Sequence, residues 1–470
     1  MTVKNSVRLS TTRCSRQVGR PGTPTPRRCW MQSLANPELS SLKERYRKRV
    51  VSAFVLIYLF ILFEGVLRKW LLPGLSSAIY FIKDPIVLYI YWYAFRFGFF
   101  SKNLLSAYFV MLLVVFFVLV SAFLLSSPEG LIIYGYGVRN YLLYFPLIFV
   151  AGKTLQLADV YRFARITLFA AIPISVLVVM QYSSGPQAFV NKGIGDDDFI
   201  FMIADGVVRP YGTFTFTAGH VVYVSACFAF LVAAIFDRAL FRAVFAGRYL
   251  LFPVSAISVA VMCFLTGSRA IYAYAAIVLL AALMVALIKK SQRNLLSLFF
   301  LVAALFVSLL IFMSSDSYQI LVERNRSAVA SEGSPVTRAF SSLYAFTRVI
   351  DDAPLWGHGI GSGTNAASAI LRAGREQGAG FLLAEDEWSR IILELGLPIG
   401  ALFILFRIFL LIWLLLKAYK ALIRQGTGVP LLLCGFLAPI LFNGVMTMQG
   451  TFLAFGVFYA CLILAACKKT

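Results

Sequence analysis

The sequence predicts an all-α, polytopic membrane protein of about twelve transmembrane helices. Of its 470 residues, 60% are hydrophobic and only 14% are charged, whereas soluble domains are roughly 25% charged. The apolar residues lie in runs long enough to cross a hydrocarbon core about 30 Å thick, which requires about 20 helical residues. A long polar interval between Met313 and Gly396 separates the last runs from the others. We therefore expect one large late loop.

The N-terminal segment has a different composition from the rest. Residues 1–49 are rich in Arg, Ser, Thr and Pro and lack an apolar run. A cleavable signal peptide needs such a run, so we interpret this segment as a disordered, basic cytoplasmic tail. Its cluster from Lys43 to Arg49 adjoins the first span. This cluster either orients the protein or contacts anionic membrane lipids.

The apolar runs define the spans and the domains between them. The spans lie near residues 50–67, 78–95, 104–125, 131–151, 163–182, 218–236, 249–266, 270–288, 295–313, 397–416, 429–447 and 451–467. The first nine helices thus occupy 50–313, with an outer loop at 183–217. A large periplasmic loop at 314–396 follows, and 397–470 hold the last three helices.

Positive charge is distributed unevenly among the loops. On the side of the two termini, the short loops carry Arg96, Lys102, Lys153, Arg162, Arg165, Arg238, Arg242, Arg248, Lys289, Lys290, Arg293, Lys417, Lys420, Arg424, Lys468 and Lys469. The opposite short loops are poorer in positive charge, so both termini are predicted to be cytoplasmic and both long loops to lie outside. Topology explains the net charge of +22 better than nucleic acid binding does.

No metal site, disulfide or other cofactor site is predicted. The seven cysteines lie in the tail or in apolar segments, and the two histidines, His220 and His358, are far apart in the sequence. Neither pattern is that of a zinc site. The acidic triplet 196–198 has no further ligand at fixed spacing, so we interpret it as a solvated loop.

The large late loop begins with an amphipathic segment. Between Val336 and Asp352, apolar residues recur at helical spacing at Ala339, Phe340, Leu343, Phe346 and Ile350. This spacing predicts a helix with one apolar face, flanked by Arg338 and Arg348. The glycine-rich segment 354–363 that follows is predicted to be a flexible turn, because no strand precedes it as in a phosphate loop.

Polar side chains at membrane depth are candidates for function. Lys83 and Asp84 are adjacent, so we expect them to neutralise each other. Arg139 lies within the fourth predicted span with no acid nearby in the sequence. It binds either a ligand anion or a distant carboxylate such as Glu64.

Two arginines are predicted to reach the same outer interface. Arg209 opens the motif RPYGTF before the sixth span, and Arg269 closes LTGSR between the seventh and eighth spans. A planar guanidinium suits a pair of phosphate oxygens, although arginines also anchor span ends at the interface. Near the tenth span, the motif AEDEWSRIILELGLPIG concentrates further charges: Glu385, Asp386, Glu387, Arg390 and Glu394.

The order of these motifs resembles that of the bacterial O-antigen ligase and O-antigen polymerase family. RPYGTF, LTGSR, DDAPLWGHGIGSG and ELGLPIG carry the resemblance, which extends from about residue 130 to 416. It implies a metal-independent glycosyltransferase of the bacterial inner membrane that uses an undecaprenyl-diphosphate-linked glycan at the periplasmic face. It also implies that Arg209, Arg269 and Arg338 bind the diphosphate.

One departure from the family concerns the catalytic base. Ligases of this family usually carry His-Asn some eleven residues before the Gly of ELG, where this chain has Glu385 and Asp386. A carboxylate can accept a hydroxyl proton, so we predict Glu385 as the general base, with Asp386 beside it. Arg139, Arg348 and Arg390 are further candidates for substrate binding. Glu394 is expected to support the turn or an arginine.

The function predicted from these features is polymerisation or ligation of polysaccharide units. The partners would be the lipid-linked donor, a glycan or lipid A-core acceptor and membrane lipids, without nucleic acid. Glu385 in place of histidine favours a polymerase. A solute transporter is an alternative, although transporters place their polar sites near mid-bilayer, and a cell-wall glycan polymerase of the rod-shape and division type is another.

Overall fold

The computed structural model describes residues 37–101, 103–124, 130–194, 202–204, 207–313, 344–351, 353–364, 367, 384 and 386–468. Several features singled out in the sequence fall outside these ranges: Lys102, the acidic triplet 196–198, residues 336–343 of the amphipathic segment (Arg338 among them), Asp352, Glu385 and Lys469.

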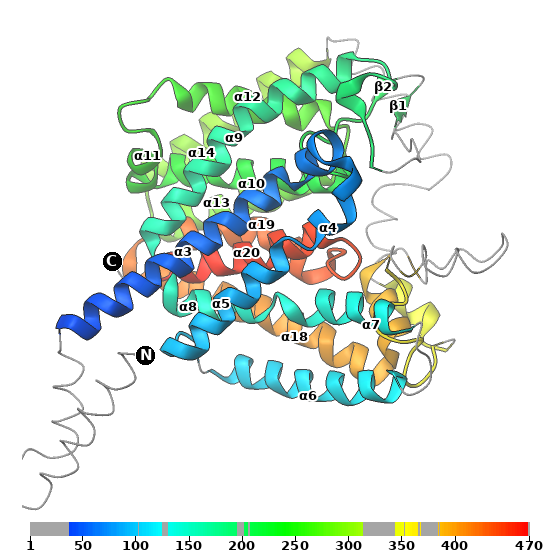
Figure 1. The fold of residues 1–470 in the computed structure, drawn as a ribbon. Helices are drawn as coiled ribbons and strands as arrows, with labels where there is room; N and C mark the ends of the chain where they lie inside the picture. Colours follow the sequence, from blue (N-terminus) through cyan, green and yellow to red (C-terminus); the bar gives the residue numbers. More distant parts are fainter. Residues whose placement is uncertain are drawn as a thin grey trace, which may run out of the picture.

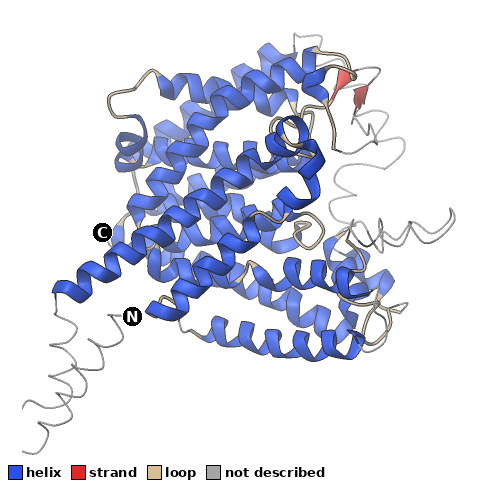
Figure 2. Cartoon of the chain, viewed as in Figure 1, coloured by secondary structure: helices blue, strands red, loops and turns tan. Residues whose placement is uncertain are grey.

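The described chain is almost entirely helical (Figure 2). The α-helices are α3 (Pro37–Val66), α4 (Ser76–Tyr80), α5 (Lys83–Phe97), α6 (Leu104–Leu124), α7 (Gly130–Val138), α8 (Pro146–Thr154), α9 (Leu157–Ser183), α10 (Thr217–Phe236), α11 (Arg238–Phe245), α12 (Leu251–Leu265), α13 (Arg269–Ile288), α14 (Gln292–Met313), α18 (Glu387–Gln425), α19 (Val429–Asn443) and α20 (Gly450–Ala466). Short π and 3₁₀ turns are η1 (Leu67–Leu71), η2 (Pro73–Leu75), η3 (Arg139–Leu143) and η4 (Phe189–Asn191).

Two details differ from the predicted architecture. Strands β1 (Met202–Ala204) and β2 (Val207–Val208) pair antiparallel within the first long loop, so the chain is not purely α-helical. Disorder was expected through residue 49, and this is wrong for residues 37–49, which form the first turns of α3. An ion pair between Arg47 and Glu44 supports this helical segment.

The helices have the length and composition of membrane spans. Five of the described helices are long and apolar enough to cross a membrane: Lys43–Leu71, Leu157–Ser183, Thr217–Phe236, Arg269–Ile288 and Glu387–Gln425. Shorter apolar helices accompany them, among them α12, α19 and α20. The chain is a multi-pass membrane protein, and the count of twelve spans stays a prediction.

The helices lie side by side in one body with two distinct ends (Figure 1). The start of α3 and the end of α20 lie at one end, which we call the terminal end. The opposite end carries β1, β2, the segment 344–364 and the start of α18, and we call it the loop end. The motifs from the late loop and the first long loop therefore reach the same end of the bundle.

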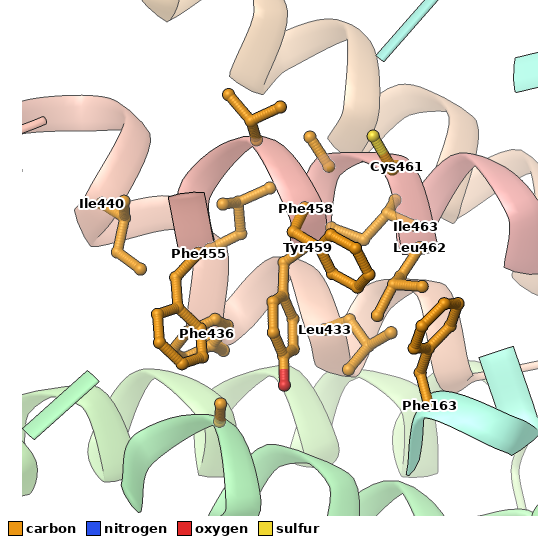
Figure 3. Close-up of a cluster of buried hydrophobic side chains, with 14 of the residues drawn as sticks. Phe163, Leu433, Phe436, Ile440, Phe455, Phe458, Tyr459, Cys461, Leu462 and Ile463 are labelled. Atoms are coloured by element: carbon orange, nitrogen blue, oxygen red, sulfur yellow. The ribbon is translucent and has the colours of Figure 1, made fainter. Parts of the chain in front are cut away.

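Helix α20 forms the centre of the hydrophobic core. Residues 452–466 are buried on every side of this helix, as expected of a helix that is apolar all round. Its Phe458 ring stacks on Tyr58 of α3 at 4.6 Å and meets Phe163 of α9 at 4.9 Å. Tyr459 projects from α20 among Phe436, Phe455 and Leu433 (Figure 3). These aromatic contacts join α3, α9, α19 and α20.

Helix α18 is folded back on itself at Gly396. This residue has φ 73° and ψ 164°, which are not helical. In a straight helix, twenty residues span about 30 Å, yet Arg407 and Glu387 form an ion pair of 2.6 Å. The element therefore consists of a first arm, residues 387–395, packed against a second arm, residues 397–425. A Cβ atom on Gly400 would lie 3.1 Å from the Ile391 carbonyl oxygen, which shows how closely the arms approach.

The two ends of the bundle predict the outcome of a topology experiment. Reporter fusions after Gln187 and after Gly333 should signal the periplasm, and fusions after Lys290 and after Arg424 should signal the cytoplasm, because positive charge is retained on the cytoplasmic side. Paired alkaline phosphatase and fluorescent protein fusions measure this. A cytoplasmic signal after Gly333 would contradict the predicted topology.

Candidate functional site

The glycine-rich segment 357–363, called the glycine turn, is bound to the first arm of α18 through one carboxylate. The Gly361 N–H donates to Oε2 of Glu394 and the Gly363 N–H donates to Oε1, each at 2.9 Å. Glu394 is buried, with 1% of its surface exposed. Two backbone donors on one buried carboxylate are charge-assisted bonds, which are roughly twice as strong as neutral ones. The expected support of the turn by Glu394 is present.

The same turn satisfies carbonyl groups that the break in α18 leaves without helical partners. The last carbonyls of a helix lack intrahelical donors, and Pro398 has no N–H to offer Glu394. The His358 N–H donates instead to the Leu393 carbonyl at 2.7 Å, and the Gly359 N–H donates to the Glu394 carbonyl at 3.0 Å. The break and the glycine turn therefore form one hydrogen-bonded unit.

Two of the glycines are required by close backbone contacts. Gly357 and Gly361 have φ of 73° and 89°, in the left-handed region that favours glycine. A Cβ atom on Gly357 would meet the backbone of Glu394, and one on Gly361 would lie 2.8 Å from the Gly137 nitrogen of α7. The turn is thus packed between α7 and α18. The sequence predicted only a flexible connection here.

Arg390 lies directly beneath the glycine turn. Its side-chain carbons would lie 3.0 Å from a Cβ atom on Gly363, and its Nη2 donates to the Ala384 carbonyl at 2.5 Å. The residue is fully buried. Its Nε and Nη1 atoms make no hydrogen bond to any described residue. A buried guanidinium with unused donors suits an anionic ligand.

A second buried ion pair fixes the start of α18. Nη1 of Arg407 donates to Oε1 of Glu387 at 2.6 Å, and both side chains are almost fully buried. Thr447 donates to the same carboxylate through its N–H at 2.9 Å and its hydroxyl at 3.1 Å. The other Arg407 donors reach the carbonyls of Ile440, Leu441 and Gly444. This pair joins α18 to the end of α19 and the loop before α20.

Arg209 is bound to the turn that precedes Arg269. Its Nε donates to the carbonyl of Thr266 at 3.2 Å, and Arg269 follows three residues later as the first residue of α13. Gly267, with φ 58°, forms the tight turn between them. Both arginines are partly buried. The structure therefore brings the RPYGTF and LTGSR motifs together at the loop end.

Lys69 holds the RPYGTF segment in place. This fully buried lysine donates through Nζ to the carbonyls of Gly212 at 3.0 Å and Phe214 at 2.8 Å. Its ammonium lies 4.2 Å from the centre of the Tyr211 ring, a cation–π geometry. Burial raises the pKa of the Tyr211 phenol, so its hydroxyl stays protonated and donates to the Lys192 carbonyl at 3.2 Å.

Arg139 is paired within the protein. Its Nε donates to Asp84 Oδ2 at 2.7 Å, and its Nη2 contacts the hydroxyl of Tyr144 at 3.2 Å. The carboxylate is Asp84 and not the suggested Glu64. The expected mutual neutralisation of Lys83 and Asp84 is also wrong, because Lys83 forms its ion pair with Glu64. The side chains of adjacent residues on a helix point in different directions, so Lys83 and Asp84 contact different partners.

These contacts form a continuous polar layer at the loop end. Glu64 accepts from Arg68 at 3.1 Å as well as from Lys83, and Lys69 next to it contacts the RPYGTF segment. On the other side, Asn140 beside Arg139 donates to the Thr447 carbonyl at 2.7 Å, and Thr447 contacts Glu387. The segments that carry the candidate residues are therefore connected to one another.

Comparison with known protein families finds a match for the segment that holds most of this site. Residues 254–404 match the family model described as O-antigen ligase. This segment, about a third of the chain, is similar to the O-antigen ligase family. The predicted resemblance is thereby confirmed for this segment. No curated protein and no solved structure matches the chain in two further comparisons.

The O-antigen ligase segment contains most, but not all, of the predicted site residues. Arg269, Arg348, Asp386 and Arg390 lie within it and are described by the structure, whereas Arg139 and Arg209 precede it. Arg348 is exposed on the helical segment 344–349, whose Phe346 packs on Trp388 with ring centres 5.7 Å apart. Asp386 caps α18 by accepting from the Ser389 N–H at 2.9 Å.

A metal centre is not apparent in the parts of the O-antigen ligase segment, or of the rest of the chain, that the structure describes. No three His, Cys, Asp or Glu side chains gather there in a group that could hold an ion. His220 is fully buried, and His358 is exposed on the glycine turn.

Two buried cations were not singled out in the sequence. Lys69 lies just after the first predicted span, 50–67, and Arg407 lies within the tenth, 397–416. An arginine inside an apolar run is itself a signal of a buried partner, so Arg407 could have been found. Nothing near Lys69 in the sequence indicates that its partners are carbonyls about 140 residues later.

Replacing Glu394 with Gln should loosen the glycine turn. The amide would offer one acceptor to two N–H donors and would place its own NH₂ against the other. A hydrogen bond to a charged group contributes about 1.5–3 kcal/mol, so amide exchange over residues 357–363 should accelerate by roughly tenfold or more. Hydrogen–deuterium exchange of the purified protein measures this. Asp351→Asn, an exposed acid near the turn, is the control; equal exchange in both variants would contradict the assignment.

Proposed function

We propose that this protein transfers a glycan from an undecaprenyl-diphosphate carrier to a glycan or lipid A-core acceptor at the periplasmic face of the bacterial inner membrane. The family match over residues 254–404 is the observation that carries the proposal. The loop end supports it, because candidate residues from both long loops lie there. In this orientation both termini are cytoplasmic.

Arg209 and Arg269 are proposed to bind the diphosphate of the donor. The bond from Arg209 to the Thr266 carbonyl positions its guanidinium beside the turn that ends at Arg269. A diphosphate offers enough oxygen atoms for two guanidinium groups, each of which can form paired hydrogen bonds. Positive charge placed there stabilises the negative charge that develops on the leaving diphosphate. Arg338 is proposed as a third contact.

Glu385 is proposed as the general base, with Asp386 as its neighbour. The acceptor hydroxyl oxygen attacks the anomeric carbon of the donor sugar, the bond from that carbon to the diphosphate breaks, and the hydroxyl proton passes to the carboxylate. Both flanking residues are fixed: the Ala384 carbonyl accepts from Arg390, and the Asp386 side chain accepts from the Ser389 N–H. Asp386 thus has a structural role, which favours Glu385 as the base.

The remaining arginines are proposed to have different roles. Arg390 is a candidate for an anion contact, because two of its buried donors have no acceptor among the described residues. Arg348 is placed to meet the donor from the surface, since it is exposed. Arg139 is committed to Asp84, so its contribution is to shape the loop end. Guanidinium groups offset phosphate charge, and the proposed reaction therefore requires no metal ion.

Removing Arg209 or Arg269 should weaken use of the donor. Loss of one charge-assisted phosphate contact, about 1.5–3 kcal/mol, should lower kcat/KM by roughly tenfold to a hundredfold. Lys should rescue only partly, because it lacks the paired geometry. Transfer from a purified lipid-diphosphate-linked glycan measures this, with and without a chelator. The exposed Arg238→Ala at the terminal end is a matched control.

The double variant distinguishes two explanations: both arginines contact one ligand, or each anchors its own span independently. If Arg209 and Arg269 contact one diphosphate, their combined loss should be smaller than the sum of the single losses. Normal turnover in both single Ala variants would show that these residues only anchor the span ends at the membrane interface. Abolition of transfer by the chelator would show that a metal carries the charge.

Glu385→Gln should abolish transfer while leaving protein level and membrane insertion unchanged, because the amide cannot accept the proton. Asp386→Asn should cost less, since an amide oxygen still accepts from the Ser389 N–H. Product formation in a deletion strain complemented with each variant measures the difference. Wild-type product with the Gln variant would exclude Glu385 as the base.

A further inference from the structure

A groove lies between α3 and α5, extending from the terminal end toward the middle of the bundle. The two helices lie side by side (Figure 1). The groove is an open surface hollow with a volume of about 640 Å³. Its lining comes from Arg45, Lys48, Arg49, Ser52, Ala53 and Leu56 of α3 and from Pro85, Ile86 and Tyr89 of α5.

The α3 wall of the groove changes from charged to apolar along its length. Residues 45, 49, 52 and 56 recur at helical spacing and so share one face of α3. The first two positions are arginines, the third is a serine and the last is a leucine. Opposite them, α5 contributes Pro85, Ile86 and Tyr89. One end of the groove thus suits an anionic group, and the other suits a hydrocarbon chain.

The three cations at the groove are not neutralised by ion pairs. Glu44 lies near Lys48 but forms its ion pair with Arg47 at 2.8 Å. Arg47 points toward the body of the protein, where it also pairs with Asp159 at 3.2 Å. Within the described residues, no carboxylate forms an ion pair with a groove cation. The positive charge on this face of α3 is therefore available to a ligand.

Aromatic side chains mark the level of the membrane interface beside these cations. Arg49 Nη1 donates to the Tyr93 hydroxyl at 3.2 Å. Trp92 is 52% exposed on the same part of α5, with the Arg96 guanidinium 5.5 Å from its ring centre. Trp and Tyr are enriched where headgroups meet the hydrocarbon core. The basic end of the groove therefore lies at headgroup depth.

We propose that this groove binds one anionic phospholipid. The lipid phosphate contacts Arg45, Lys48 and Arg49, and an acyl chain lies along Leu56 and Ile86. This site is at the opposite end of the bundle from the glycine turn and does not depend on the proposed transferase activity. Because α3 leads directly to Glu64 and Lys69, a lipid that fixes α3 also steadies the helix that holds the RPYGTF segment.

Native mass spectrometry of the full-length protein tests the site. Purified protein is mixed with phosphatidylglycerol or with phosphatidylcholine of identical acyl chains, and bound lipid is counted. Arg45→Ala, Lys48→Ala and Arg49→Ala combined should reduce phosphatidylglycerol retention by about a hundredfold, since each basic residue near an anionic membrane surface contributes a factor of about five. Phosphatidylcholine retention should be low and unchanged.

The matched control removes the same charge elsewhere. Lys417, Lys420 and Arg424 are exposed near the end of α18, and their combined replacement by Ala should leave phosphatidylglycerol retention unchanged. An equal loss in both triple variants would overturn the proposal, because it would show general attraction to positive charge. Undiminished retention in the groove variant would overturn it as well.

A second variant keeps all charges and fills the groove. Ser52 is exposed at the junction of the basic and apolar parts, so Ser52→Trp should displace the acyl chain without disturbing the core. It should lower phosphatidylglycerol retention by about tenfold. Retention equal to that of the unmodified protein would overturn the groove as the binding site, even if the charge variants had failed to fold.

Discussion

The carboxylate of Glu394 holds the loop end together. By accepting from Gly361 and Gly363 it binds the glycine turn to the first arm of α18, and the turn in return satisfies the carbonyls of residues 393 and 394. Unsatisfied backbone groups in an apolar environment cost several kcal/mol each. A helix broken in buried surroundings is therefore stable only when another segment supplies the missing donors, and here that segment belongs to the large late loop.

Charge compensation between distant segments sets the positions of the other helices. Arg407 and Glu387 are joined across the fold-back of α18, and Arg139 and Asp84 are joined between η3 and α5. Removing one partner of a buried pair typically costs about 3–5 kcal/mol. Such pairs contribute little more to the stability of the fold than apolar packing would, but they specify which helices are neighbours. The polar layer at the loop end thus connects the segments that carry the arginine motifs.

The helices were predictable because membrane spans are encoded locally. The helix α10, expected at 218–236, is observed at Thr217–Phe236, since apolar run length alone determines it. Partner choice is not encoded locally, so the sequence could place Arg139 at membrane depth but could not select Asp84. The sequence predicted that Arg209 and Arg269 reach the same outer interface. It did not predict that Arg209 contacts the turn before Arg269. The predicted base, Glu385, lies outside the described residues and stays a prediction.

The contact between Gly363 and Arg390 constrains how this site can change over evolutionary time. A methyl group at position 363 would lie 3.0 Å from two carbons of the arginine and against the Glu394 carboxylate. Any larger residue at 363 must displace the Glu394 carboxylate, whose Oε1 would lie 2.5 Å from the added atom, as well as the Arg390 side chain. Among descendants of this chain, position 363 should therefore remain glycine for as long as Glu394 binds the turn.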